Sequence, residues 1–446
     1  MQAHSFHAGR ELFTVAFAAV AAAAGAGPGL AQQAGTVAFE NVNVLPMDRE
    51  TVLTDHTVIV RDGRIEAVGP AASTPVPDGA TRVDGTGKYL LPGLAEIHAH
   101  IPGIQAGGEN RQFAEDVLFL YVAAGATTIR GMQGHPTQLE LRRRVDSGEL
   151  IGPRMYLAAP QLSGRSVPSP DTGRVLVRTA TQAGFDLLKI QEGLSSEAYA
   201  AVVDEAKQQG IPYAGHMPDD VGLRAALEAG QTTIDHLDNY VVTLEGDENN
   251  IPALAQETRQ AGAAVVPTMS LWETLRGGQD VEALLTRAEL RYMPRAVVEG
   301  WTEQVNRIRA DTDPGDAARE IELRNRMLGA LNDAGVPILM GTDAPQIFSV
   351  PGFSLYRELP VMIAAGMSPF EVLASGTINV ARHFGTENET GTITVGLRAD
   401  LLLLNANPLD DIANVEQRAG VMVNGRWLDE AEIQRRLEEI AARNAG

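Results

Sequence analysis

The sequence reads Leu94-Ala95-Glu96-Ile97-His98-Ala99-His100 at the point where a long series of alternating apolar and helix-like segments begins. The run is short and apolar, which is typical of a buried strand. Because side chains on a strand alternate between its two faces, His98 and His100 are expected to project to the same side. Two imidazoles placed in this way can clamp a metal ion.

Seven more apolar runs follow, separated by Ala-, Leu- and Glu-rich stretches that end in glycine. Strand and helix patterns that alternate eight times are typical of parallel strands closed into a (β/α)8 TIM barrel, an α/β fold whose active site lies at the carboxyl ends of the strands. Polar residues that end these runs are therefore candidate site residues. The expected strands are 94–100, 127–132, 155–159, 187–191, 212–216, 232–237, 263–269 and 337–343.

The two ends of the sequence have a different pattern. Residues 57–61 and 64–68 alternate in polarity around Asp62-Gly63, which predicts a β-hairpin. Short strands are also expected at 391–393, 400–404 and 421–423, with a helix at 429–443. We expect residues 32–91 and 392–446 to form a small β-sandwich domain built from both ends, next to a barrel domain at 92–391. The stretch 273–332 is longer than one crossover helix needs and predicts an added helical lid or rim.

The first residues form a third kind of sequence. An apolar segment runs from Leu12 to Ala24, and small residues stand one and three positions before the Ala31–Gln32 bond. This pattern predicts a signal peptide over residues 1–31, and therefore export to the periplasm or secretion.

Composition limits the partners. The formal net charge of -21 disfavours nucleic acid and anionic membranes, and a small-molecule amide or peptide is the expected substrate. A homo-oligomer is compatible with the sequence. There is no cysteine, so histidine, aspartate, glutamate and lysine must supply any metal ligands.

Several strand-end residues have metal-binding chemistry. His216 ends the fifth run and His236 the sixth, so four histidines converge on one rim, and Asp343 ends the eighth run. Lys189 lies inside the apolar fourth run, where burial disfavours its charged form. A neutral amine can take up carbon dioxide as a carbamate and bridge two divalent metal ions. The competing interpretation is a lysine paired with a buried acid.

These motifs resemble the amidohydrolase superfamily, in its binuclear subgroup with a carboxylated lysine. The resemblance rests on the strand 91–100, on Gly341-Thr342-Asp343-Ala344, and on the return segment from Gly391 to Leu409. It extends to imidazolonepropionase-like, prolidase-like and ochratoxinase-like amidohydrolases. Glu96 stands where aspartate is usual, and Gly131 where an acid is frequent, so the contacts that support the ligands need not be those of the relatives.

The resemblance implies a role for each ligand. His98, His100 and Asp343 would hold the more buried ion, His216 and His236 the more exposed one, and carboxylated Lys189 would bridge them. Two such ions lower the pKa of a shared water from about 15.7 toward ~7, which yields a bridging hydroxide. Asp343 would carry the proton from this water to the leaving amine. Zinc is the expected metal, and manganese, cobalt or nickel also fit these ligands.

Substrate contacts are expected from residues on loops that follow the strands. The candidates are His135, Arg130, Tyr240, Trp272 and Tyr356. For Arg130, a structural ion pair is the favoured alternative.

The leading functional hypothesis is hydrolysis of a C–N amide bond in a peptide-like or N-acyl amino acid substrate, as in a dipeptidase or carboxypeptidase. The same metal chemistry would hydrolyse a cyclic amide or a lactone. A mononuclear deaminase or imidazolonepropionase-like enzyme is a further alternative, and Lys189 discriminates against it because such sites need no lysine on the fourth strand. A periplasmic metal- or ligand-binding protein is the non-enzymatic alternative.

Overall fold

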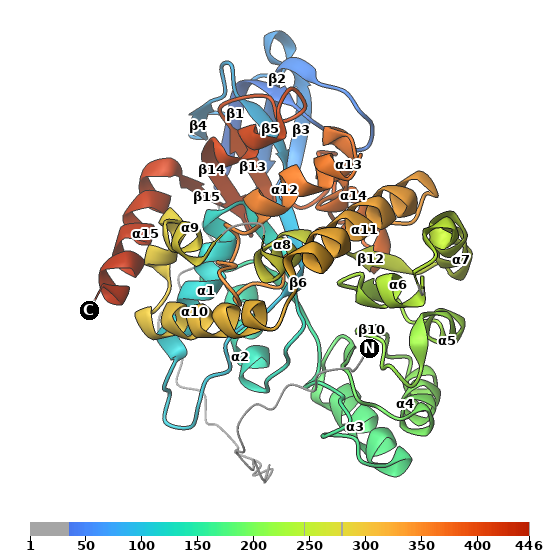
Figure 1. Ribbon diagram of the computed structural model, residues 1–446. Helices are drawn as coiled ribbons and strands as arrows, with labels where there is room; N and C mark the ends of the chain where they lie inside the picture. Colours follow the sequence, from blue (N-terminus) through green and yellow to red (C-terminus); the bar gives the residue numbers. More distant parts are fainter. Residues whose placement is uncertain (1–34, 245, 278–279, 446) are drawn as a thin grey trace.

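The structure is a computed structural model that describes residues 35–244, 246–277 and 280–445 (Figure 1). The predicted signal peptide at 1–31 lies outside these residues. Within them, no helix combines the length and the apolar character that crossing a membrane requires.

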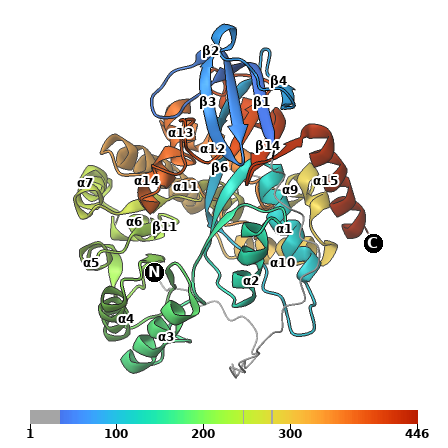
Figure 2. The ribbon, with the colours of Figure 1, turned by 180° about the vertical axis from the view of Figure 1, so that it is seen from behind.

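One sheet joins the two ends of the sequence, and we call it the terminal sheet. Its strands follow the order β15-β14-β13-β5-β1-β2-β3, with β4 paired to β1. Strand β13 runs antiparallel to β5 and pairs Leu402 with Leu91, so the two ends share one hydrogen-bonded ladder. Figure 2 shows this sheet above the rest of the molecule. The strands are β1 Thr36–Val44, β2 Leu53–Arg61, β3 Arg64–Pro70, β4 Thr81–Asp84, β5 Tyr89–Pro92, β13 Leu401–Leu404, β14 Arg418–Val423 and β15 Arg426–Asp429.

The predicted hairpin is present in the terminal sheet. Asp62 and Gly63 both have positive φ angles, of 49° and 74°, as a tight two-residue hairpin turn requires. The strand expected at 391–393 was wrong, because these residues form no strand. Ile393 is nevertheless buried, and its N–H donates to the carbonyl of Pro46 at 3.0 Å, so the segment is held by a single bond rather than by a ladder.

Seven of the eight predicted central runs contain parallel strands. They form two sheets, with the orders β6-β7-β8 and β9-β10-β11-β12. A parallel bridge between Ala158 and Leu187 connects the end of the first sheet to the start of the second. These strands are β6 Leu94–Ala99, β7 Ala126–Gly131, β8 Arg154–Leu157, β9 Leu188–Ile190, β10 Tyr213–Gly215, β11 Thr233–Asp235 and β12 Ala264–Val266.

The eighth run, at 337–343, is bridged to its neighbours without forming a regular strand. Ile338 pairs in parallel with Val265 of β12, and Ala344 pairs in parallel with Ala99 of β6. The N–H of Ile97 donates to the carbonyl of Met340 at 2.8 Å. The run therefore lies between the last strand of one sheet and the first strand of the other.

Helices follow most of the central strands, and many begin and end at the residue types that favour such ends. Ser169 and Ser195 cap the first turns of α3 and α4 through their hydroxyl groups, and Gly184 and Gly210 end the same helices with positive φ. In Figure 1, α3, α4, α5 and α7 lie along the outer side of β9–β12. The helices are α1 Arg111–Ala123, α2 Thr137–Asp146, α3 Pro170–Ala183, α4 Ser196–Gln209, α5 Gly222–Ala229, α6 Asp238–Thr243, α7 Ile251–Ala261, α8 Met269–Arg276, α9 Val281–Leu285, α10 Arg295–Ala310, α11 Pro314–Asp333, α12 Leu355–Ala364, α13 Pro369–Ser375, α14 Ile378–Phe384 and α15 Glu430–Asn444, with 3-10 turns η1 Ala71–Ser73, η2 Glu248–Asn250, η3 Ala288–Tyr292 and η4 Ile412–Glu416.

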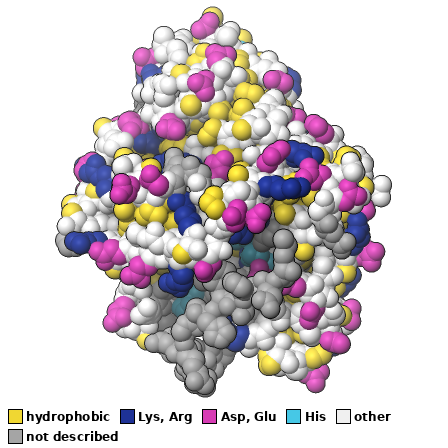
Figure 3. All heavy atoms as spheres, in the orientation of Figure 1, with side chains coloured by type: hydrophobic (Ala, Val, Ile, Leu, Met, Phe, Trp, Pro, Cys, Tyr) yellow, Lys and Arg dark blue, Asp and Glu magenta, His cyan; other side chains and the backbone are white. Residues whose placement is uncertain are grey.

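The predicted terminal helix is present as α15, and Ile433, Leu437 and Ile440 are buried on one of its faces. The stretch after β12 is helical, as expected, and forms α8 to α11. On the molecular face seen in Figure 3, acidic and basic side chains are intermingled rather than gathered by sign, and histidine side chains reach the surface in its lower half.

Candidate metal centre

Three predicted ligands meet where β6 ends beside the eighth run. The Nε2 atom of His100 lies 2.9 Å from Oδ1 of Asp343, and Nε2 of His98 lies 3.4 Å from the same oxygen. One ligand atom of each residue lies within 4.8 Å of the others. The backbone fixes this arrangement, because the N–H of Asp343 donates to the carbonyl of His98 at 2.8 Å. The three side chains form a group suited to one metal ion.

The other three predicted ligands lie next to this group. The ring centroid of His236 is 4.4 Å from that of His98 and 4.5 Å from that of His216. Nζ of Lys189, on β9, is 3.1 Å from Nε2 of His98. The structure therefore brings together all six predicted ligand side chains, which come from or directly follow five separate strand segments.

The strand ends that carry these residues have unusual backbone angles. His236, Thr268 and Asp343 have φ angles of 76°, 48° and 65°, in a region that residues other than glycine rarely occupy. Such conformations cost free energy and cluster at functional sites. Gly215, just before His216, has a φ of 115°, and a Cβ atom there would lie 2.7 Å from Cδ of Lys189. A glycine is required at 215 so that β10 can pass close to the lysine.

Gly341 permits a second close approach. A Cβ atom at this position would lie 2.5 Å from Cγ1 of Val266 and 2.8 Å from the backbone nitrogen of His98. Both distances are too short for any side chain. The absence of a side chain at 341 therefore lets the eighth run pack directly against β6, and this contact sets the position of Asp343 relative to His98.

Burial makes the imidazoles good ligands. It lowers the pKa of His98 and His236 well below the usual value and that of His216 to about 3. The rings are therefore neutral at neutral pH and keep a lone pair for a metal ion. Three buried atoms of the predicted ligands, Nδ1 of His98, Nε2 of His236 and Oδ1 of Asp343, make no hydrogen bond of good geometry. Unsatisfied buried polar atoms are rare in proteins, and Nε2 of His236 and Oδ1 of Asp343 fit a metal centre.

A buried ion pair between Arg130 and Asp235 lies next to His98. Oδ2 of Asp235 lies 2.9 Å from Nδ1 of His98 and 3.1 Å from Nη2 of Arg130, and neither side chain of the ion pair has any exposed surface. Arg130 also donates to the carbonyl of Ile97 and to the hydroxyl of Thr233. A carboxylate beside Nδ1 is a common neighbour of a metal-binding histidine, and here Nε2 of the same ring faces Asp343.

Glu96 supports Asp343 from the same strand as His98. Its carboxylate accepts hydrogen bonds from the backbone N–H of Thr342 at 2.6 Å and from the Thr342 hydroxyl at 3.0 Å. Burial raises the pKa of Glu96 well above its usual value, although the bonds to Thr342 oppose this shift. The longer glutamate, at a position where aspartate is usual, thus reaches across to the eighth run.

Three of the predicted substrate contacts have partners within the protein, and their roles toward a substrate stay predictions. Arg130 forms the buried ion pair described above. Tyr240 has no exposed surface, and its hydroxyl pairs with that of Thr258 at 2.9 Å. Tyr356 donates to the carbonyl of Ala124 at 3.0 Å, at the end of α1.

The other two candidates lie closer to the surface, and nothing in the structure tests a contact with substrate. Trp272, on α8, stacks against the guanidinium of Arg324, which lies 3.7 Å from the ring centroid. Nδ1 of His135 lies 2.7 Å from the hydroxyl of Thr137, next to the start of α2. These residues stay predictions as substrate contacts.

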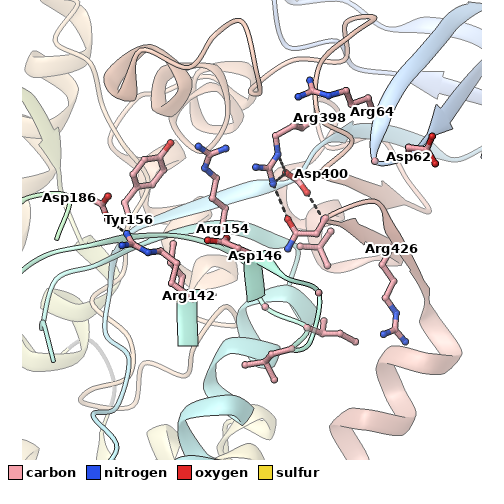
Figure 4. Close-up of a pocket in the computed structure, with 18 residues that line it drawn as sticks. Asp62, Arg64, Arg142, Asp146, Arg154, Tyr156, Asp186, Arg398, Asp400 and Arg426 are labelled. Carbon is pink, nitrogen blue, oxygen red and sulfur yellow. Dashed lines mark hydrogen bonds and ion pairs between the residues drawn. The ribbon is translucent and has the colours of Figure 1, made fainter. Parts of the chain in front are cut away.

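Two cavities lie away from the metal group. One, of about 860 Å³, is lined by Tyr356 and by residues of α8, α12 and α15. The other, of about 920 Å³, lies where the hairpin of the terminal sheet meets α2 and the amino end of β8 (Figure 4). Its arginines are largely paired already, as Arg142 is with Asp186 and Arg398 with Asp400. Neither cavity is lined by the predicted ligands, which stand at the opposite, carboxyl ends of the strands.

Sequence reasoning missed three supporting residues. Asp235 and Thr233 are two positions apart, so the sequence places both side chains on one face of β11. Nothing in the sequence indicates that their common partner is Arg130. Thr268 contacts Nδ1 of His236 at 2.9 Å from the end of β12. Arg324 reaches the site from α11, and no periodic pattern indicates such a contact.

Comparisons with known proteins agree with this geometry. A family model described as the amidohydrolase family matches residues 89–428. The imidazolonepropionase of Idiomarina loihiensis is 24% identical over 421 residues, which cover 86% of this chain and 94% of the relative. The ochratoxinase of Aspergillus niger is 23% identical over 435 residues, covering 83% of this chain and 81% of the relative. The solved structure of bottromycin amidohydrolase is 25% identical with a TM-score of 0.73, covering 92% of this chain and 90% of that protein. The protein therefore belongs to the amidohydrolase family of metal-dependent enzymes and is a hydrolase acting on carbon–nitrogen bonds.

Proposed function

We propose that this protein hydrolyses an acyclic C–N amide bond in a peptide-like or N-acyl amino acid substrate, at a centre of two divalent metal ions bridged by carboxylated Lys189. The observation that carries this proposal is the position of Lys189. Its side chain is 1% exposed, and its nitrogen lies 3.1 Å from the ring nitrogen of His98. It therefore lies within the group of predicted ligands rather than at its edge toward solvent.

The surroundings of Lys189 favour a neutral amine. The side chain is 1% exposed, and burial to this extent disfavours the charged form of a lysine. Within the group of predicted ligands the amine lies beside an imidazole nitrogen of His98. A neutral amine can add carbon dioxide and release one proton, which forms an N–C bond and a carbamate with two oxygens. These oxygens would supply one ligand to each ion.

The remaining ligands divide into two sets. His98, His100 and Asp343 would hold one ion, and His216 and His236 the other. Unsatisfied atoms occur in both sets, Nδ1 of His98 and Oδ1 of Asp343 in the first and Nε2 of His236 in the second. When bound, divalent ions supply a water of lowered pKa and polarise the scissile carbonyl. Zinc is proposed because imidazole nitrogen and carboxylate oxygen are common zinc ligands.

Asp343 is proposed to move the proton. The residue is held by the hydrogen bond from its backbone N–H to the carbonyl of His98. Its side chain is 8% exposed, so the carboxylate is largely shielded from solvent. It would accept the proton of the attacking water on a carboxylate oxygen and return it to the leaving nitrogen. Breaking the C–N bond then yields a carboxylate and an amine. A general acid and base of this kind contributes typically 10²- to about 10⁴-fold in rate.

The fold and the location of the protein are also part of the proposal. We infer that the eight central runs close into a (β/α)8 barrel, supported by the parallel bridges at Ala158, Ile338 and Ala344. Such a barrel places its site at the carboxyl ends of the strands, where the six ligands stand. Residues 1–31 are proposed to be a signal peptide that exports the enzyme.

Hydrolysis of a cyclic amide at a mononuclear site is the second candidate function. The similarity to an imidazolonepropionase over 86% of the sequence favours it. In that case Lys189 would be an ordinary buried residue, and one ion would be held by part of the ligand set. A ligand-binding protein without activity is the third candidate, and it would leave Asp343 without a chemical role.

Metal content and amide hydrolysis, measured for wild type, Lys189→Ala and Lys207→Ala, test the proposal. Lys207 is an exposed lysine on α4 and serves as the matched control. Wild type and the control are expected to hold about two ions per protein molecule and to hydrolyse members of a panel of dipeptides and N-acyl amino acids. Lys189→Ala should lose the activity, and added short carboxylic acids should restore part of it. One ion per molecule, with Lys189→Ala as active as the control, would refute the binuclear proposal.

A further inference from the structure

A buried arginine reaches the predicted metal centre from the helices α8 to α11 that follow β12, which we call the helical insertion. Arg324, on α11, is 2% exposed, which is unusual for an arginine. Its Nε and Nη2 atoms donate to Oε1 of Glu320 at 3.1 and 2.8 Å, one turn earlier on the helix. Its guanidinium lies 3.7 Å from the centroid of the Trp272 ring on α8. The charge is thus neutralised, and the plane of the group is fixed by stacking.

The other end of the guanidinium is directed at a ligand. Nη1 of Arg324 donates to the backbone carbonyl of His236, which lies 88 positions earlier in the sequence. Neither the carboxylate of Glu320 nor the ring of Trp272 requires this bond. The fork of an arginine allows both tasks at once, because its donors point in fixed and different directions.

The carbonyl of His236 needs such a partner because the backbone leaves the sheet at this residue. His236 and Leu237 have consecutive positive φ angles of 76° and 64°. The N–H of His236 is still part of the sheet, donating to the carbonyl of Val266 at 2.8 Å. The turn is therefore held from one side by β12 and from the other by Arg324, and the ring of His236 is fixed at Nδ1 by Thr268.

We propose that Arg324 is a positioning residue for His236, so that the affinity of the His216–His236 side of the centre for a metal ion is set from the helical insertion. This inference rests on the proposed function in one respect, namely that His236 is a metal ligand. It adds a residue outside the barrel strands, and it assigns the insertion a task in building the centre. Losing a residue that orients a metal ligand typically weakens metal binding by about 10- to 100-fold.

Titration of metal-free protein with Co²⁺ alone, followed by its visible absorption, tests this proposal without any substrate. Arg324→Met removes the donors and keeps a similar stem, and Arg324→Lys keeps a cation that can reach the carbonyl. Arg326→Met is the matched control, because Arg326 lies on the same helix, is exposed, and pairs with Glu248. Circular dichroism of each variant reports whether the fold is intact.

Arg324→Met is expected to weaken only the second Co²⁺ ion, by about 10- to 100-fold, and to change its absorption bands, whereas Arg326→Met should titrate like wild type. Arg324→Lys should restore part of the affinity. Equal affinities in Arg324→Met and Arg326→Met would overturn the proposal, as would an equal weakening of both ions that Arg324→Lys does not relieve. If Arg324→Met does not fold, the same titration of Arg324→Gln decides between these outcomes.

The wild-type titration separates this proposal from the proposed function. If wild type binds one Co²⁺ ion, the binuclear centre is refuted. A single ion that is still weakened by Arg324→Met would support the role of Arg324, because His236 would then belong to that site. A single ion that is unaffected by Arg324→Met would overturn both proposals.

Discussion

Replacing Asp235 with asparagine should destabilise the protein more than any single change at its surface. The carboxylate of Asp235 contacts Arg130 at 3.1 Å and His98 at 2.9 Å, and it accepts a hydrogen bond from Thr233 at 2.7 Å. Burial raises its pKa, but the charge of Arg130 and the hydrogen bond from Thr233 oppose this effect, and the pKa lies below its usual value. Asp235 is therefore ionised, and Asp235→Asn leaves a buried guanidinium without its counter-ion.

The magnitude follows from the burial of both partners. Removing one partner of a fully buried ion pair costs about 3 to 5 kcal/mol, because the other charge is left uncompensated. Arg130 keeps its hydrogen bonds to Ile97 and Thr233, so about 3 kcal/mol is expected for Asp235→Asn. Arg130→Met should cost a similar amount. The double variant buries no unpaired charge, and it should cost less than the sum of the single variants by about 1 to 3 kcal/mol.

Urea unfolding of metal-free protein, followed by tryptophan fluorescence, measures all three variants. Arg82→Met serves as the control, because the ion pair of Arg82 with Glu40 is exposed on the terminal sheet and is worth about 0 to 1 kcal/mol. Additive costs in the double variant would refute the reasoning, since the two side chains would then not act as a pair. A cost of Asp235→Asn no larger than that of the control would refute it equally.

Three further outcomes are expected. Burial raises the pKa of Glu358 from 4.5 to about 7. The stability that this group contributes is therefore complete below pH 4.5 and is lost as the pH rises through 7. In urea unfolding, the free energy of unfolding of wild type should fall between pH 4.5 and 7.5, and Glu358→Gln should remove on the order of 3 kcal/mol of this fall. Gly341→Ala should cost about 1 to 3 kcal/mol in the same assay and weaken metal binding, because the new methyl group meets the backbone of His98. Gly300→Ala is the control and should have neither effect, because a methyl group there meets no atom within 4 Å. Tyr240→Phe should cost about 1 kcal/mol through the lost bond to Thr258 and leave KM for the substrate unchanged, whereas a raised KM would support Tyr240 as a substrate contact.

The strands and the ligands at their ends could be predicted because both follow a period of two. An apolar run of four to eight residues indicates a buried strand, and the parity of His98 and His100 fixes the face to which they point. The same logic places Lys189 between the buried residues Leu188 and Ile190 of β9. Seven runs contain strands, and the predicted ligands meet at their ends.

The eighth run shows where this logic fails. Its residues are as apolar as those of the other strands, but the close approach at Gly341 and the positive φ of Asp343 break the regular ladder. Neither feature can be read from hydrophobicity, because both result from the need to bring a carboxylate beside two imidazoles. The irregular geometry occurs at the site itself, as it does at His236 and Thr268.

The surroundings of the aromatic candidates could not be predicted, for a different reason. Tyr240 and Tyr356 follow central strands in the sequence, where loops at the rim of the site were expected, but they lie on α6 and α12. Whether such an aromatic residue turns toward a substrate or into the core depends on which helix packs against it. For Tyr240 this helix is α7, through Thr258, and for Tyr356 it is the end of α1, through Ala124. Such contacts are set by tertiary packing alone.

Tertiary packing also decides the role of Arg324. A buried arginine on an inserted helix has no periodic signal, so its role must come from what it contacts, and it contacts the backbone of a ligand rather than its side chain. Asp235 acts on the ring of His98, Glu96 on the residue before Asp343, and Arg324 on the carbonyl of His236. Each contacts a different predicted ligand or the residue beside it, from β11, from β6 and from α11. The predicted ligands are thus held by three independent sets of contacts, which predicts that changes in different sets weaken metal binding additively.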